Sequence, residues 1–115
     1  MQETEIVDYL NIFYARLMGE LTMAEDKYSP YDAENDYYLV EIKSRDTKYD
    51  SWIIQEDKYK TNLKLATDSN RKFIYLNEYQ KNILTWNITD LTDGGYNFNW
   101  TQRPMPTTTR FKNTD

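Results

Sequence analysis

The chain of 115 residues contains no cysteine and no histidine. Without cysteine there are no disulfides and no thiolate metal sites, which fits a reducing, intracellular setting. Without histidine there is no imidazole acid–base catalysis, no Ser-His-Asp triad and no histidine-ligated zinc. Any catalysis must therefore use carboxylates, lysine, tyrosine or a hard metal ion held by oxygen atoms.

Long apolar runs are also absent, since none approaches the ~20 residues that span a bilayer. The first ten residues, MQETEIVDYL, lack the basic region and apolar stretch of a signal peptide. We therefore expect a cytoplasmic protein with no membrane partner. The length is that of one domain, and 39% apolar with 16% aromatic residues indicates a folded chain.

The charge is unevenly distributed. The formal net charge of −5 argues against a protein that simply coats DNA. Residues 1–36 hold nine acids and two bases, a net charge of −7, whereas residues 37–115 carry a net charge of +2. The first third could therefore supply metal ligands, and the remainder could still face phosphate groups.

Apolar spacing predicts the order of helices and strands. We expect a helix at 3–18, a strand at 20–26, a turn or short strand at 29–32, a turn at 33–36, a strand at 37–44, a helix at 51–67 capped by Asp50 or Ser51, and a strand hairpin at 72–79 and 82–88. The buried stripe of the first helix is predicted to contain Ile6, Leu10, Phe13, Tyr14 and Leu17. The order αβββαββ predicts an α/β (α+β) fold with a mixed sheet flanked by helices. Residues 1–92 would form the core and residues 93–115 an irregular C-terminal arm.

The central strand carries a carboxylate and an ammonium group on one face. Glu41 and Lys43 are two residues apart, so their side chains project together, roughly 6.5–7 Å apart. Asp32 precedes this strand in a turn, from which its carboxylate could come beside Glu41. The two carboxylates and the carbonyl of Ile42 would form an oxygen cage for Mg²⁺. Such an ion activates water and stabilises phosphoryl charge, and Lys43 could orient or deprotonate the attacking water and offset developing negative charge.

Asp32 followed by Glu41-Ile42-Lys43 resembles the signature of the PD-(D/E)xK nuclease superfamily, except that Pro30 stands two places before Asp32. The segment YDAENDYYLVEIKSRDTKYDSW is similar to small phage-encoded members, both homing-type endonucleases and junction resolvases. The resemblance covers roughly residues 3–88. It implies a restriction-endonuclease-like core and Mg²⁺-dependent cleavage of DNA, with Mn²⁺ as a substitute.

The resemblance also implies supporting residues on the two helices. A glutamate of the first helix often assists the metal in this superfamily, and we expect Glu5, with Glu3 and Glu20 as alternatives. The second helix contains Gln55 and Tyr59 at a Gln-x-x-x-Tyr spacing like that of RecB-type nucleases. Lys58 and Arg45 are candidates for contacts with DNA. Cutting both strands would need two copies of one active site, so a homodimer is expected.

Other interpretations of these residues stay open. Asp32 could simply bond its own turn, and Glu41 with Lys43 could form an ion pair on a solvated strand. The role of Glu5 could be limited to compensating the helix dipole. At the level of the whole protein, the alternatives are a non-catalytic DNA- or protein-binding module of the same fold, and an acidic protein that mimics DNA or binds a basic partner.

Overall fold

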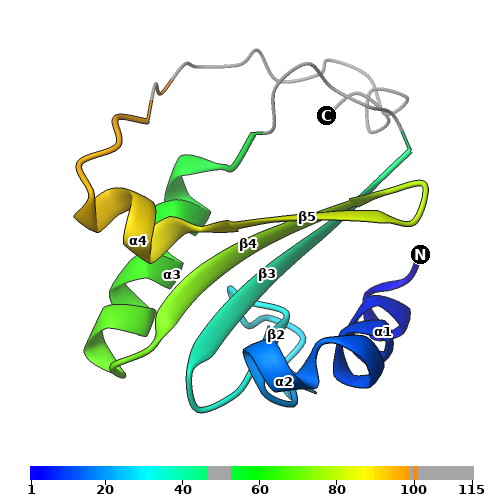
Figure 1. The fold of residues 1–115 in the computed structure, drawn as a ribbon. Coiled ribbons are helices and arrows are strands. Elements are labelled where there is room, and N and C mark those ends of the chain that lie inside the picture. Colours follow the sequence, from blue (N-terminus) through cyan, green and yellow to red (C-terminus); the bar gives the residue numbers. More distant parts are fainter. Residues whose placement is uncertain (47–52, 99, 101–115) are drawn as a thin grey trace.

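The computed structural model describes residues 1–46, 53–98 and 100 (Figure 1). The elements in chain order are α1 (Glu3–Phe13), α2 (Ala15–Met18), β1 (Thr22–Met23), β2 (Ala33–Glu34), β3 (Tyr38–Arg45), α3 (Glu56–Asp68), β4 (Lys72–Tyr79), β5 (Asn82–Asn87) and α4 (Ile88–Asp93). The expected α/β class with a mixed sheet is confirmed. Within the described residues, no helix combines the length and apolarity needed to cross a membrane.

The sheet of the described residues has five strands in the order β1-β2-β3-β4-β5. Strands β1, β2 and β3 form an antiparallel meander, and β4 and β5 form an antiparallel hairpin. Strand β4 runs parallel to β3, as a crossover connection through a helix allows. Glu41 of β3 lies opposite Tyr75 of β4 in the register, and Lys43 lies opposite Asn77.

Each face of the sheet is covered by helices, which makes three layers. Figure 1 shows α1 with α2 on one side of the sheet and α3 with α4 on the other. The core on the α1 side comprises Ile6, Val7, Leu10, Leu21, Ala33, Val40, Ile42, Ile74 and Leu76. The core on the α3 side comprises Leu39, Ala66, Phe73, Tyr75 and Ile88. Alternation along β3 therefore points Glu41 toward the α3 side.

Strand β2 occupies a segment predicted to be a turn. The prediction of a turn over residues 33–36 is wrong for its first half, because Ala33 and Glu34 pair with strands on both sides. Burial of Ala33 and two ladders of hydrogen bonds outweigh the local preference for a turn. Only the second half turns, where the Asn35 side-chain oxygen accepts the N–H groups of Tyr37 and Tyr38 at 2.8 Å.

Helix α3 begins five residues later than predicted. The expected caps Asp50 and Ser51 lie outside the described residues, and Gln55 is the residue before the first turn. The segment ahead of it is held against the sheet, because the carbonyl of Ile53 accepts the hydroxyl of Tyr75 at 2.6 Å. Ile54 packs beside the α3-side core. These contacts keep residues 53–55 out of the helix.

The first predicted helix is divided in two at Tyr14, whose φ of −128° is not helical. Asn11 bonds both backbone groups of Leu21, and this draws the following chain back beside α1. The predicted buried stripe ends at Leu10. Phe13 and Leu17, predicted to be buried, are 65% and 76% exposed.

The chain after β5 is more ordered than the pattern indicated. Helix α4 was not expected, and its first turn is capped by the Asn87 side chain, which accepts the N–H of Asp90 at 2.9 Å. Beyond it, Phe98 and Trp100 place their rings 4.8 and 5.1 Å from that of Tyr59 in α3. The start of the predicted C-terminal arm thus contacts α3, and residues 101–115 lie outside the described part.

Candidate metal centre

Glu41 and Lys43 lie on the central strand β3 and point to the same side. Glu41 is buried, with 3% of its surface exposed, whereas Lys43 is exposed. Alternation along the strand accounts for the shared side, and α3 covers the position of Glu41 but not that of Lys43. The arrangement puts a buried carboxylate next to a solvated ammonium group.

Asp32 reaches the same place from the end of β2. Ala33 pairs with Val40, so the antiparallel register puts Asp32 opposite Glu41. The backbone N–H of Asp32 donates to the carbonyl of Val40 at 2.8 Å. Its side-chain Oδ2 accepts the backbone N–H of Ile42 at 2.7 Å. The structure therefore brings together Asp32, Glu41 and Lys43, the three residues predicted to be catalytic.

The carboxylate of Glu41 has an unusual environment. Its Oε1 atom is buried and has no hydrogen-bond partner among the described residues. The nearest cation is the Lys58 ammonium of α3, 4.0 Å from Oε1. Burial, and then the negative charge of Asp32, raise the pKa of Glu41 to about 7. A buried carboxylate that is only weakly paired has unused capacity to accept a cation.

Of the acidic residues at the start of α1, Glu3 is the one beside the site. Burial and the nearby Asp32 carboxylate raise the pKa of Glu3, and Lys43 and Lys58 oppose the shift. Glu5, the residue expected from the resemblance, has another role: its carboxylate accepts the N–H of Gln2 at 2.7 Å in a capping box. The structure thus favours Glu3, named as an alternative, over Glu5.

Helix α3 contributes Lys58 and Asn62. Both side chains donate to the carbonyl of Pro30, at 3.4 and 2.9 Å, two residues before Asp32. Lys58 was expected near the site, but Asn62 was missed. The sequence did contain a sign of it: Asn62 lies between Tyr59 and Ala66 in the buried stripe of the helix. A polar side chain in such a stripe indicates a specific hydrogen bond, because burial without one is unfavourable.

Three other expected residues have different surroundings. Gln55 is exposed at the start of α3. The Tyr59 hydroxyl lies 3.0 Å from that of Thr92 in α4, so the Gln-x-x-x-Tyr pair does not converge on the carboxylates. The guanidinium of Arg45 donates to Asn77 at 2.7 Å and to the carbonyl of Ile53, which holds the segment before α3 against the sheet.

The residues present fit a divalent cation of the magnesium type. In the part of the chain that the structure describes, no cluster of three or more acidic side chains is arranged to hold a metal ion. Magnesium is usually held by only one or two carboxylates and keeps several water ligands. Asp32 and Glu41 supply two such groups, and the unpartnered Oε1 of Glu41 is the structural observation that supports the fit.

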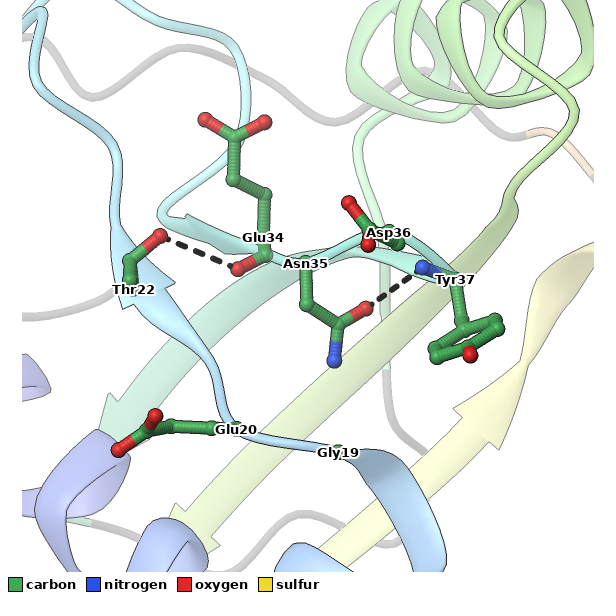
Figure 2. Close-up of a pocket in the computed structure, with 7 residues that line it drawn as sticks. All are labelled: Gly19, Glu20, Thr22, Glu34, Asn35, Asp36 and Tyr37. Carbon is green, nitrogen blue, oxygen red and sulfur yellow. Dashed lines mark hydrogen bonds between the residues drawn. The ribbon is translucent and has the colours of Figure 1, made fainter.

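A surface pocket lies elsewhere, between the end of α2 and the turn from β2 to β3 (Figure 2). It is lined by Gly19, Glu20, Thr22, Glu34, Asn35, Asp36 and Tyr37. Glu20, the other alternative for the helical glutamate, lines this pocket and not the carboxylate site. None of Asp32, Glu41 and Lys43 lines this pocket, and Glu34 in its lining is paired with Arg71 at 2.9 Å.

Comparisons with protein-family models, with curated proteins and with solved structures found no match to this chain.

Proposed function

We propose that the protein is a Mg²⁺-dependent DNA endonuclease with a restriction-endonuclease-like core. The single observation that supports this most directly is the bond from the Ile42 N–H to Asp32. It holds one carboxylate against the strand that carries Glu41 and Lys43. Oxygen ligands and a lysine, without histidine, are sufficient for phosphodiester hydrolysis that depends on a metal ion.

The topology is consistent with this proposal. The core implied by the resemblance has the order αβββαβ, and the described chain follows it from α1 through the β1–β2–β3 meander to α3 and β4. Helix α3 connects β3 to the parallel strand β4, and its Lys58 lies beside Glu41. At the start of α1, Glu3 interacts with Asp32.

Each residue has a distinct role in the proposed reaction. Asp32 and Glu41 would hold the metal, and Glu3 would add negative charge beside them. The ion supplies a water of lowered pKa and stabilises negative charge on the phosphate. Lys43, exposed next to Glu41, orients the attacking water and offsets developing charge. Lys58 balances the buried carboxylate of Glu41.

The test is a cleavage assay on supercoiled plasmid and on branched DNA, with Mg²⁺, with Mn²⁺ and with EDTA. We expect metal-dependent nicking that Lys43→Ala reduces by roughly 10²-fold or more, because a charge-stabilising group is lost. Lys60→Ala is the matched control, since Lys60 is an exposed lysine of α3 that pairs with Glu56 on the same helix. Absence of cleavage of every substrate by folded protein would refute the proposal. Preference for plasmid or for junctions would separate a homing-type enzyme from a resolvase.

A second candidate is a non-catalytic binding module of the same fold. The observation in its favour is the apolar surface of α1 and α2, where Ile12, Phe13 and Leu17 are 72%, 65% and 76% exposed. It predicts association without cleavage. The same surface is available for the homodimer that cutting two strands requires, and light scattering of the Leu17→Lys variant against wild type tests that use.

A further inference from the structure

Lys58 and Asn62 are four residues apart and therefore share one face of α3. Both donate to one acceptor, the carbonyl of Pro30. The Asn62 bond is the shorter, at 2.9 Å, and Asn62 is fully buried, whereas the Lys58 side chain is 34% exposed. The two residues connect α3 to the loop that leads into β2.

The same loop is tied to the sheet on its other side. Asp32 donates its N–H to Val40 of β3, and its carbonyl accepts the N–H of Ala24 at 2.9 Å. Pro30 has no N–H of its own, so its carbonyl is the backbone group through which it can be held. The segment from Pro30 to Asp32 is consequently fixed between α3 and β3.

Burial of the polar side chain of Asn62 is unfavourable for folding, and only the hydrogen bonds that the side chain makes offset this. Leucine has the same number of heavy atoms and the same branching, and it would occupy the site without a polar group. The Oδ1 atom of Asn62 has no hydrogen-bond partner among the described residues, so only its amide donor is used. Among the described residues, the one hydrogen bond of the Asn62 side chain is the bond to the loop of Asp32.

We propose that Asn62 is a positioning residue, which sets the place of the Asp32 carboxylate relative to Glu41 by holding the Pro30 carbonyl. This inference rests on the proposed metal centre. Asn62 does not touch the cation or the DNA. Asn62 restricts the conformations of the loop. Asp32 is therefore already in place before the cation binds, and binding does not have to order it. Loss of Asn62 should therefore weaken cation binding, with no change in the residues that bind the ion.

The experiment measures Mn²⁺ binding by isothermal titration calorimetry, without DNA, for wild type, Asn62→Leu and Asn62→Ala. The two variants remove the same donor, one with a larger and one with a smaller side chain, so that an effect shared by both does not come from one change of volume. Thr89→Val is the matched control. Thr89 is also buried, and its hydroxyl accepts the N–H of Phe73 at 2.8 Å, away from the Asp32 loop. Circular dichroism checks that each variant is folded.

We expect both Asn62 variants to bind Mn²⁺ about 10- to 100-fold more weakly than wild type, the range seen when partners of metal ligands are removed. Thr89→Val should bind as wild type does. Equal affinity of wild type and folded Asn62→Leu would overturn the positioning role and leave the nuclease proposal intact. Equal weakening by Thr89→Val would also overturn it, as a general effect of stability. Failure of the wild type to bind Mn²⁺ would overturn both proposals together.

Discussion

Asp32 and Ile42 are joined by a side-chain to backbone hydrogen bond of 2.7 Å, although ten residues separate them in sequence. Ile42 stands between Glu41 and Lys43, so this bond fixes the Asp32 carboxylate at the middle of the Glu-x-Lys segment. The resulting pair of carboxylates is energetically unfavourable in the absence of a cation, because both are negative and one is buried. Stability and cation binding should consequently oppose each other at this site.

Replacement of Glu41 by glutamine should stabilise the cation-free protein above neutral pH. The pKa of Glu41 is about 7 in the folded protein and 4.5 in the unfolded chain. Below pH 4.5 both states hold the proton and the variant gains nothing. Between pH 4.5 and 7 the unfolded state releases the proton more readily, so wild-type stability falls as the pH rises. Above pH 7 the wild type has lost the full amount, about 3 kcal/mol of its free energy of unfolding, and the variant avoids this loss.

Urea denaturation of wild type and Glu41→Gln at pH 4.5 and pH 8, in EDTA, measures this difference. The gain should be present at pH 8 and small at pH 4.5. In separate measurements at pH 8 without EDTA, where the wild-type carboxylate is deprotonated, the variant should lose Mn²⁺ binding and cleavage. A variant that is less stable than wild type at pH 8 would show that the Glu41 carboxylate is well solvated or well paired.

Cation affinity should rise with pH and level off near pH 7. Binding at Glu41 requires the deprotonated carboxylate, and the raised pKa means that protons compete with the metal below neutrality. Between pH 5 and 6.5 the apparent affinity for Mn²⁺ should rise by roughly tenfold per pH unit, and above pH 7.5 it should be flat. Calorimetric titrations across this range test the expectation, and an affinity already constant from pH 5 upward would contradict it.

Glu3→Gln should weaken Mn²⁺ binding more than Glu5→Gln does. Glu3 interacts with Asp32, whereas Glu5 accepts the N–H of Gln2, a bond that glutamine can also accept in a capping box. Both changes remove one charge from the first turn of α1, so their effects on helix stability match. Equal binding by the two variants, measured at pH 8, would remove Glu3 from the site.

Gly19→Ala should destabilise the fold more than Gly95→Ala. Both glycines have positive φ, +79° and +85°, and Gly19 combines it with a ψ of 165°, a region essentially restricted to glycine, so each substitution carries a backbone cost of about 1–3 kcal/mol. A Cβ atom at Gly19 would also lie 3.1 Å from Nδ2 of Asn35, the group that donates to the carbonyl of Met18. At Gly95 a Cβ atom meets nothing within 4 Å. Thermal unfolding of the two variants compares the two sites, and similar melting temperatures would contradict the expectation.

Local pattern determined the parts of the fold that depend on near neighbours. Period-two alternation placed Glu41 and Lys43 on one side of a strand, and the α/β order with a mixed sheet followed from the spacing of apolar residues. The lack of histidine and cysteine restricted any catalysis to carboxylates, lysine, tyrosine or a metal ion held by oxygen atoms. Where local preference conflicted with pairing, as at Ala33 and Glu34, the prediction failed because two neighbouring strands supplied the bonds.

Contacts between residues far apart in sequence decided the rest. Whether Glu3 or Glu5 lies beside Asp32 depends on how α1 packs on the sheet, and a helical stripe does not specify this. The proposed role of Asn62 depends on a bond to Pro30, 32 residues earlier in the chain. The raised pKa of Glu41 also results from contacts with parts of the chain that are distant in sequence. The residue pattern of a single strand specifies which ionisable groups that strand presents. Their burial and their charged neighbours follow from the packing of residues far apart in sequence, which the pattern of one strand does not contain.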